Sequence, residues 1–146
     1  MRRRFMSVLV FVLVVLLMAA CSSNDKTSSE ESSAVVDVPG EYQTLTIDEF
    51  ANIIENQSDE YAILNVHIPY AGEIEGTDDN VPYNDIDALT SALPDKDAPI
   101  ILYCRSGNMS EQASRQLVEM GYTNLYDVPG GMNAWQASGR TLIDTQ

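Results

Sequence analysis

The thiol of Cys104 is followed by six residues whose types suit contact with a small anion. In order, these residues are Arg105, Ser106, Gly107, Asn108, Met109 and Ser110. An arginine brings positive charge to an anion, serine hydroxyls donate hydrogen bonds, and a glycine lets a loop curl until its backbone amides converge. Because the thiolate is the nucleophilic form of cysteine, this stretch predicts a reactive Cys104 in an anion-holding loop.

A strand and a helix are expected to hold this loop. Residues 100–103 form a short apolar run that is typical of a buried strand. The helix that follows has three apolar residues at the spacing of one buried face, namely Ala113, Leu117 and Met120. Gly121 suits the end of this helix, and Ser110 is a candidate for its N-cap. Cys104 would then lie between a strand end and a helix start, where free backbone N–H groups and the helix dipole favour a thiolate.

The rest of the domain alternates between strands and helices. Thr46 and Glu49 have the spacing of a capping box, which predicts a helix from residue 47 to about residue 55. Further strands are expected at 42–45, 61–66 and 124–128, further helices at 84–93 and 132–137, and a long loop at 67–80. This order predicts an α/β domain with a mainly parallel central sheet flanked by helices. In such sheets ligands bind beyond the carboxyl ends of the strands, where Cys104 is expected.

The first twenty residues have the composition of an export signal. Three arginines at 2–4 precede an apolar run at 5–18, and two alanines then lead into Cys21. This arrangement resembles the lipobox of bacterial lipoproteins, whose cysteine becomes the new N-terminus and carries lipid. An ordinary cleaved signal and a retained anchor helix are the alternatives. Acyl chains such as palmitate on Cys21 would hold the protein on a membrane.

Three segments are therefore expected along the chain. Residues 1–20 are a lipoprotein signal peptide, residues 21–40 a serine-rich, acidic and flexible tether that starts at the lipid anchor, and residues 41–146 the folded domain. The expected location is extracytoplasmic, on the periplasmic or outer face of a bacterial membrane.

Composition narrows the classes of function. The chain has 146 residues and a formal net charge of −14, which argues against binding to nucleic acid. Its two cysteines form no CxxC pair and it has one histidine, so a metal site is not expected. No motif implies a cofactor. If Cys21 carries lipid, Cys104 has no partner for an intramolecular disulfide, and an unpaired thiol in an exported protein needs another reason to be there.

Several segments together match the pattern of a known family. CRSGNMS after a hydrophobic strand, with VPGGMNAW about two dozen residues later, resembles the rhodanese domain. Residues 72–81 resemble the GHIPGAxNI segment of that family, with Glu73 and Glu75 in place of histidine and proline. LNVH at 64–67 takes the place of its DVR motif, with Asn65 and His67 as departures. The resemblance covers residues 42–140 and implies a single rhodanese-like domain.

The resemblance also implies a chemistry. In that family the loop cysteine is the nucleophile, so Cys104 would take the outer sulfur of thiosulfate or a polysulfide as a persulfide. A thiol or other thiophilic acceptor, including a thiol on another protein, would then remove it. Residues 105–110 would contact the donor, and His67 and Tyr70 are further candidates for the pocket, although a structural hydrogen bond is the favoured role of His67. Met109 stands where close relatives often have arginine or a hydroxyl residue, which favours a polysulfide or thiol-bound sulfane donor over thiosulfate.

Two other functions are alternatives to sulfur transfer. Cysteine phosphatases and arsenate reductases use a CX5R loop, which needs arginine at the sixth position after the cysteine, where this sequence has Ser110. A non-catalytic rhodanese-like module, for binding or for carrying sulfur, is the other alternative, and the presence of Cys104, Arg105 and Gly107 argues against it.

Overall fold

The structure, a computed structural model, describes residues 41–146. The predicted signal peptide at 1–20, the lipidated Cys21 and the tether at 21–40 therefore lie outside the described residues. Within 41–146, no helix is both long and apolar enough to cross a bilayer. Strands and helices alternate along this part of the chain, as its periodicity predicts, apart from two successive strands at 62–65 and 79–80.

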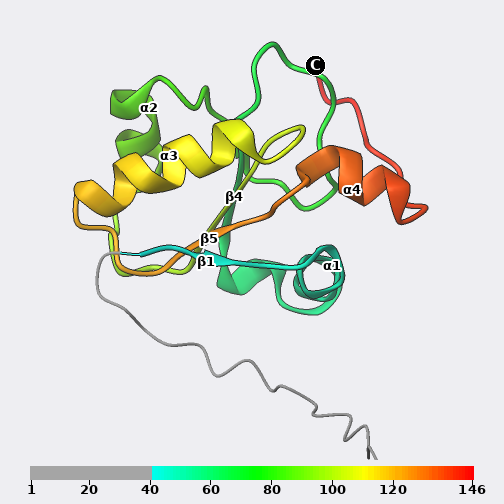
Figure 1. Ribbon diagram of the computed structural model, residues 1–146, viewed down its shortest axis with the longest axis horizontal. Coiled ribbons are helices and arrows are strands. Elements are labelled where there is room, and N and C mark those ends of the chain that lie inside the picture. Colours follow the sequence, from blue (N-terminus) through cyan, green and yellow to red (C-terminus); the bar gives the residue numbers. More distant parts are fainter. Residues whose placement is uncertain (1–40) are drawn as a thin grey trace, which may run out of the picture. The chain divides into compact units, whose positions relative to one another are not determined.

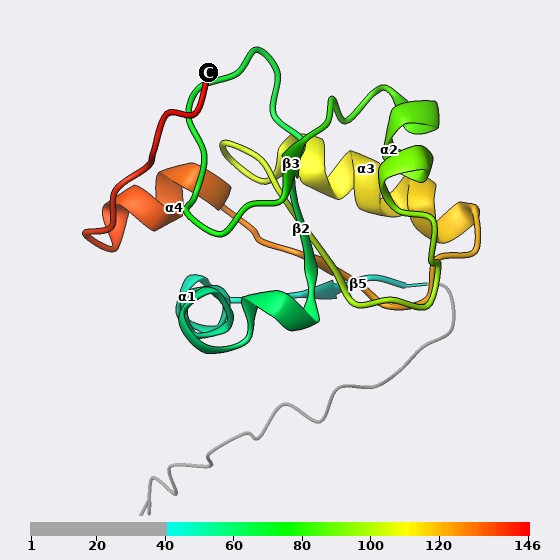
Figure 2. The same cartoon turned by 180° about the vertical axis from the view of Figure 1, so that it is seen from behind.

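Five parallel strands form the central sheet, in the spatial order β1-β5-β4-β2-β3 (Figures 1 and 2). Their bounds are β1 Gln43–Thr44, β2 Ala62–Asn65, β3 Asp79–Asn80, β4 Ile100–Tyr103 and β5 Leu125–Asp127. The prediction of an α/β domain with a parallel sheet flanked by helices is confirmed. The prediction of an uninterrupted loop at 67–80 is wrong at its end, because Asp79 and Asn80 pair with β2.

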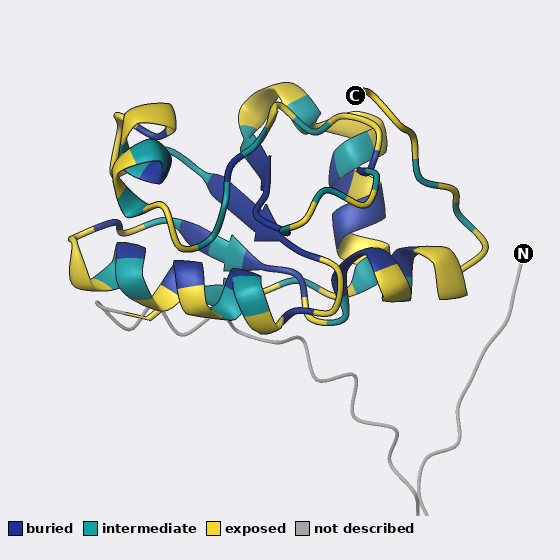
Figure 3. Ribbon diagram, turned by 90° about the horizontal axis from the view of Figure 1, so that it is seen from above, coloured by how far each residue is buried: buried dark blue, intermediate teal, exposed yellow. Residues whose placement is uncertain are grey.

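Helices cover both faces of the sheet in the described part of the chain. Their bounds are α1 Ile47–Asn56, α2 Ile86–Ala92, α3 Asn108–Glu119 and α4 Gly131–Ala137, and the short 3-10 helix η1 spans Ser58–Glu60. One core cluster joins α2 and α3 to the sheet through Leu89 and Leu117. The other joins α1 and α4 to the opposite face through Phe50 and Trp135. Figure 3 shows the result, with buried strands and helices that are exposed on their outer sides.

The capping box predicted for α1 is confirmed. Thr46 Oγ1 accepts a hydrogen bond from the Glu49 amide at 3.3 Å, and the Thr46 amide donates to Glu49 Oε2 at 2.8 Å. These two bonds satisfy N–H groups that a helix start leaves free. The helix expected at 84–93 is shorter than predicted, because Asp85 caps its start and α2 begins at Ile86.

Two details predicted for α3 are wrong. Ala113 and Leu117 are fully buried as expected, but Met120 is 42% exposed, because α3 ends at Glu119 and Met120 is its C-cap. Ser110 is not the N-cap. Gly107 takes that position with a left-handed φ of 97°, so Ser110 lies within the first turn of the helix.

Candidate active site

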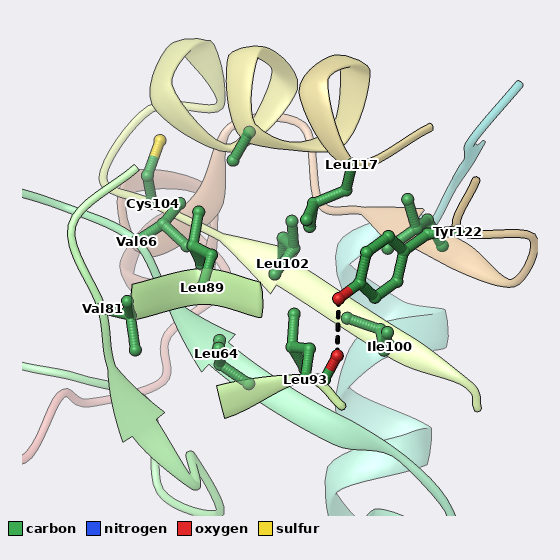
Figure 4. Close-up of a cluster of buried hydrophobic side chains, with 12 residues drawn as sticks. Leu64, Val66, Val81, Leu89, Leu93, Ile100, Leu102, Cys104, Leu117 and Tyr122 are labelled. Atoms are coloured by element: carbon green, nitrogen blue, oxygen red, sulfur yellow. Dashed lines mark hydrogen bonds between the residues drawn. The ribbon is translucent and has the colours of Figure 1, made fainter. Parts of the chain in front are cut away.

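Cys104 lies directly after β4, at the carboxyl edge of the sheet. It is 1% exposed and packs in the same cluster as Val66, Leu89 and Ala113. Figure 4 shows its sulfur beside the beginning of α3. The Gly107 amide donates a hydrogen bond to Sγ at 3.1 Å, and the Ser110 hydroxyl donates one at 3.7 Å. The sulfur is thus covered by apolar side chains on one side and met by polar donors on the other.

Gly107 allows this arrangement because of its backbone conformation. Its φ of 97° belongs to the left-handed region that side chains disfavour, and a Cβ at this position would lie 3.0 Å from the Gly130 amide nitrogen. The Gly107 carbonyl accepts hydrogen bonds from the Ser110 hydroxyl and the Glu111 amide. One glycine therefore turns its N–H toward the sulfur while its C=O begins α3.

The start of α4 holds the loop from behind. The Met132 amide donates to the Cys104 carbonyl, and the Asn133 amide donates to the Arg105 carbonyl, both at 2.9 Å. These bonds satisfy free N–H groups of α4 with loop carbonyls. Gly131 makes the approach possible, since a Cβ there would lie 1.9 Å from the Cys104 carbonyl oxygen. The VPGGMNAW segment, where α4 begins, thus fixes the backbone of the CRSGNMS loop.

The other predicted loop residues lie on both sides of the loop. Arg105, Ser106 and Asn108 are exposed, whereas Met109 is half-buried and packs against the core. Arg105 lines a cavity of about 240 Å³ beside α4. Ser106 and Asn108 line another of about 360 Å³, which reaches Asp127. The structure therefore offers approaches to the loop from two directions.

His67 follows β2 at the same edge of the sheet. Its side chain is 9% exposed, and Nδ1 has no hydrogen-bond partner among the described residues. The structural hydrogen bond expected of the ring is thus not seen at Nδ1. Burial lowers the pKa of His67, and the positive charge of Arg105 lowers it further. A neutral imidazole close to Arg105 can accept a proton or a hydrogen bond from a ligand that brings its own donor.

Tyr70 is engaged by the C-terminal segment. Its hydroxyl accepts a hydrogen bond from the Thr145 amide and shares another with the Thr145 hydroxyl, each at 3.1 Å. Thr145 in turn donates to Glu73 Oε1 at 2.8 Å. The contacts seen for Tyr70 are therefore structural ones, and its place in the pocket stays a prediction.

Asp127 is a residue of this region that the sequence did not single out. It is 4% exposed at the end of β5, and its Oδ1 has no hydrogen-bond partner among the described residues. Burial raises the pKa of Asp127, while the Ser110 side chain and the Val128 amide lower it again in part. The sequence offers one signal for this residue. Asp127 comes two residues after the core residue Leu125, so both side chains lie on the same face of β5.

Within residues 41–146, no three histidine, cysteine, aspartate or glutamate side chains are grouped so that they could hold a metal ion. Two acidic side chains of loop 73–79 accept hydrogen bonds, Asp78 from the Ile63 amide and Glu73 from the Thr145 hydroxyl, each at 2.8 Å.

Comparisons with known proteins agree with this geometry. The UBA4 adenylyltransferase and sulfurtransferase of Candida albicans is 29% identical over 100 residues, which is 66% of this chain and 22% of that protein. The thiosulfate sulfurtransferase GlpE of Pseudomonas fluorescens is 39% identical over 70 residues, which is 47% of this chain and 61% of that protein. The chain thus spans less than two thirds of the length of either relative.

Solved structures and a family model complete the comparison. A rhodanese-related protein of Thermoplasma volcanium has a TM-score of 0.57 at 23% identity, over 70% of this chain and 98% of that one, and so shows the same fold. CoADR-RHD of Bacillus anthracis has a TM-score of 0.54 at 27% identity, over 69% of this chain and 18% of that one. The model of the rhodanese-like domain matches residues 31–138. This match covers most of the sequence, and the chain belongs to the family of rhodanese-like domains.

Proposed function

We propose that this protein is a sulfurtransferase that carries sulfane sulfur on Cys104 as a persulfide. The observation that carries the proposal is the Gly107 N–H donated to Cys104 Sγ at 3.1 Å, at the carboxyl edge of a parallel sheet. Such a donor stabilises negative charge on sulfur. The sulfurtransferase names of the curated relatives point to the same chemistry.

The proposed cycle has two displacements. Cys104 thiolate attacks the outer sulfur of thiosulfate or a polysulfide, the S–S bond of the donor breaks, and its electron pair leaves with sulfite or the shortened polysulfide. An acceptor thiolate, from a small molecule or a thiol protein, then attacks the outer sulfur of the persulfide. The bond between the two sulfurs breaks, and Cys104 thiolate is restored. No metal or cofactor takes part in either step.

The test is loading of sulfur on the purified protein. After incubation with thiosulfate or a polysulfide, intact mass is expected to rise by about 32 Da, the persulfide increment, and reduction should remove it. Cys104→Ser is the control, since it keeps the size of the side chain and lacks the thiol. Failure of every donor to load the wild type, or equal loading of the serine variant, would contradict the proposal.

A second function has one observation in its favour. Cys104 is 1% exposed, so a non-catalytic binding module is compatible with the structure in this respect. A sulfur donor can reach Cys104 Sγ only if the residues that cover the sulfur move aside, whereas a binding module needs no such movement. The mass experiment separates the two functions, because only the enzyme loads sulfur and then releases it to an added thiol.

The identity of the sulfur donor is testable at Met109. This half-buried side chain offers no charge to an anion. We predict that Met109→Arg speeds loading from thiosulfate by about tenfold, since a charge-assisted hydrogen bond contributes roughly 1.5–3 kcal/mol. Loading from a polysulfide should change less. The control is Gln112→Arg, which adds the same charge on an exposed part of α3. Equal rates of loading from thiosulfate in the wild type and Met109→Arg would contradict the proposal that Met109 influences the choice of sulfur donor.

We also propose that the domain works outside the cytoplasm, tethered by lipid on Cys21. The support is the sequence pattern alone, with basic residues, an apolar run and small residues before this cysteine. Mass spectrometry of the mature N-terminus is the test, and a lipid-bearing Cys21 is the expected result. A Cys21→Ser protein should leave the membrane fraction, and its retention there would contradict the proposed anchor.

A further inference from the structure

A cavity of about 240 Å³ lies beside the cysteine loop, and no step of the cycle proposed above uses it. Its walls come from the loop after β2, the cysteine loop, α4 and the C-terminal segment, which lie side by side in Figures 1 and 2. The residues that line it are Ala71, Arg105, Met132, Asn133, Gln136 and Leu142. The cavity thus combines one cation and two carboxamides with three apolar side chains, and no acidic residue of the described chain lines it.

Arg105 is a cation whose charge is not used by the fold. Its guanidinium makes no ion pair or hydrogen bond with any residue of 41–146. The other cationic side chains of this range all contact oxygen atoms, in the pairs Arg115–Glu111 and Arg140–Asp48 and between Lys96 and the Met120 carbonyl. The chain has a formal net charge of −14, so acidic partners are abundant. A cation that pairs with none of them is available to an anion from solution.

Two carboxamides of α4 extend the polar side of the cavity. Asn133 and Gln136 are three residues apart, which makes their side chains neighbours on the helix surface. Both are exposed, and neither side chain forms a hydrogen bond within the described range. Each carboxamide carries two N–H donors. These donors can bind the oxygen atoms of an anion that Arg105 attracts.

The apolar lining favours an organic anion over an inorganic one. Met132 is 1% exposed and Leu142 is half-buried, so they form an apolar wall. Thiosulfate has no apolar part to place against this wall, whereas methylene groups gain by leaving water there. The volume is below the about 300–1,000 Å³ of pockets for drug-sized ligands. It therefore suits a short aliphatic chain with one charged end.

The cavity lies next to the reacting residue. Arg105 follows Cys104 directly, and the Met132 amide donates to the Cys104 carbonyl at 2.9 Å. The sulfur lies on the α3 side of the loop (Figure 4), whereas the cavity lies on the α4 side. A molecule with its charged end in the cavity must reach past the loop backbone to the sulfur. Several bonds must therefore separate its charge from its reactive atom.

We propose that this cavity binds the carboxylate end of the sulfur acceptor, an organic thiol with a flexible aliphatic chain between its carboxylate and its sulfur. The inference rests on the proposed sulfurtransferase function and names the class of acceptor. Arg105 pairs with the carboxylate, and the Asn133 and Gln136 side chains donate to it. The aliphatic chain packs on Met132 and Leu142.

The cavity changes no bond in the transfer itself. The acceptor thiolate attacks the outer sulfur of the Cys104 persulfide, and the bond between the two sulfurs breaks. Its electron pair returns to Cys104 Sγ as a thiolate. The acceptor leaves as a persulfide with the transferred sulfur and its proton, so no oxidant or reductant is needed.

The test compares two thiols of equal length, 6-mercaptohexanoate and 6-mercaptohexanol. The full chain is loaded with a polysulfide, freed of donor and mixed with either thiol, and loss of the increment of about 32 Da gives the rate of transfer. Arg105→Gln removes the cation, and Gln136→Glu places a negative charge in the cavity. We expect each to slow transfer to the acid by about fivefold to tenfold, and transfer to the alcohol to stay within about twofold of the wild type.

Ala137→Glu is the matched control. It adds the same charge as Gln136→Glu at an exposed position of α4 that does not line the cavity. Both rates should match those of the wild type. Equal slowing in this control would attribute the effect to general repulsion and overturn the proposal. Unchanged transfer to the acid in Arg105→Gln and Gln136→Glu, or equal slowing with both thiols, would also overturn it. If urea unfolding shows that one of these two variants is not folded, the other decides.

Binding without sulfur chemistry separates this proposal from the proposed function. Hexanoate, which has no thiol, is titrated into the unloaded full chain while the side-chain amide NMR signals of Asn133 and Gln136 are followed. We expect shifts that saturate in the wild type and are lost in Arg105→Gln, and none with hexanol. No shift with hexanoate would overturn the site even if Cys104 loads sulfur. If no donor loads Cys104, saturating shifts would still establish the carboxylate site while the proposed function fails.

Discussion

Gly131→Ala is expected to destabilise the domain by about 3 kcal/mol or more and to abolish sulfur loading on Cys104. The added Cβ would lie 1.9 Å from the Cys104 carbonyl oxygen and 2.8 Å from its carbonyl carbon. Both are backbone atoms, so no flexible side chain can move aside. Either α4 or the loop must shift, and with it the hydrogen bonds donated by Met132 and Asn133 to the loop carbonyls. The measurement is urea unfolding together with the persulfide mass assay.

Gly139→Ala is the matched control for this substitution. Gly139 also has a left-handed φ, 88°, but a Cβ there would meet nothing within 4 Å. Gly139→Ala should destabilise the domain only by the conformational penalty of about 1–2 kcal/mol, and sulfur loading on Cys104 should stay intact. A similar loss of stability in both variants would show that the backbone conformation, and not the contact with Cys104, explains the cost. The role given to Gly131 as the contact between α4 and the loop would then fail.

The sequence predicted those parts of the fold that local patterns determine. The apolar run at 100–103, the helical spacing after it and the pairing of Thr46 with Glu49 all depend on neighbours within one or two turns of chain. The alternation of such elements then predicts a parallel sheet with Cys104 at its carboxyl edge. Apart from Met120, which is exposed, each of these predictions is confirmed by the structure.

Long-range contacts explain what the sequence did not show. β3 consists of the polar residues Asp79 and Asn80, and only its pairing with β2 makes it a strand. Ser110 looked like a helix cap because serine often is one, whereas the fold turns its hydroxyl toward Cys104. Asp127 lies on the inward face of β5, where an alternating pattern predicts an apolar residue. Positions at which local rules fail are often those that serve the site.

Tyr103 is the second residue with a large expected effect, and it acts on the face of β4 opposite Cys104. Its ring packs against Phe50 at a centroid distance of 5.8 Å. Its hydroxyl accepts a hydrogen bond from the Ile74 amide at 3.0 Å and lies 2.6 Å from the Thr77 hydroxyl. Since Thr77 also lies 2.6 Å from the Ile74 carbonyl oxygen and donates to it, the Tyr103 proton is directed to Thr77. This network holds the loop that follows β2.

Removal of this hydroxyl should destabilise the domain at neutral pH. Tyr103→Phe leaves the fully buried Ile74 amide without its partner, at a cost of about 1–3 kcal/mol. Tyr126→Phe is the control, because that ring is only half-buried and its hydroxyl makes no hydrogen bond within residues 41–146. The measurement is the free energy of unfolding in urea. If the Tyr103→Phe and Tyr126→Phe proteins unfold at the same urea concentration, the buried network contributes nothing.

The same hydroxyl makes stability depend on alkaline pH. Burial raises the pKa of Tyr103 from 10.0 to about 12, so the folded protein keeps a proton that the unfolded chain loses above its own pKa. This contribution is complete below about pH 10 and is lost as pH rises toward about pH 12. Between about pH 8 and about pH 11 the wild type should lose roughly 1.4 kcal/mol more than Tyr103→Phe, one pKa unit of linkage. Other tyrosines titrate in both proteins, so the comparison isolates Tyr103. Parallel loss of stability in the two proteins would show that this phenol ionises without cost in the folded state.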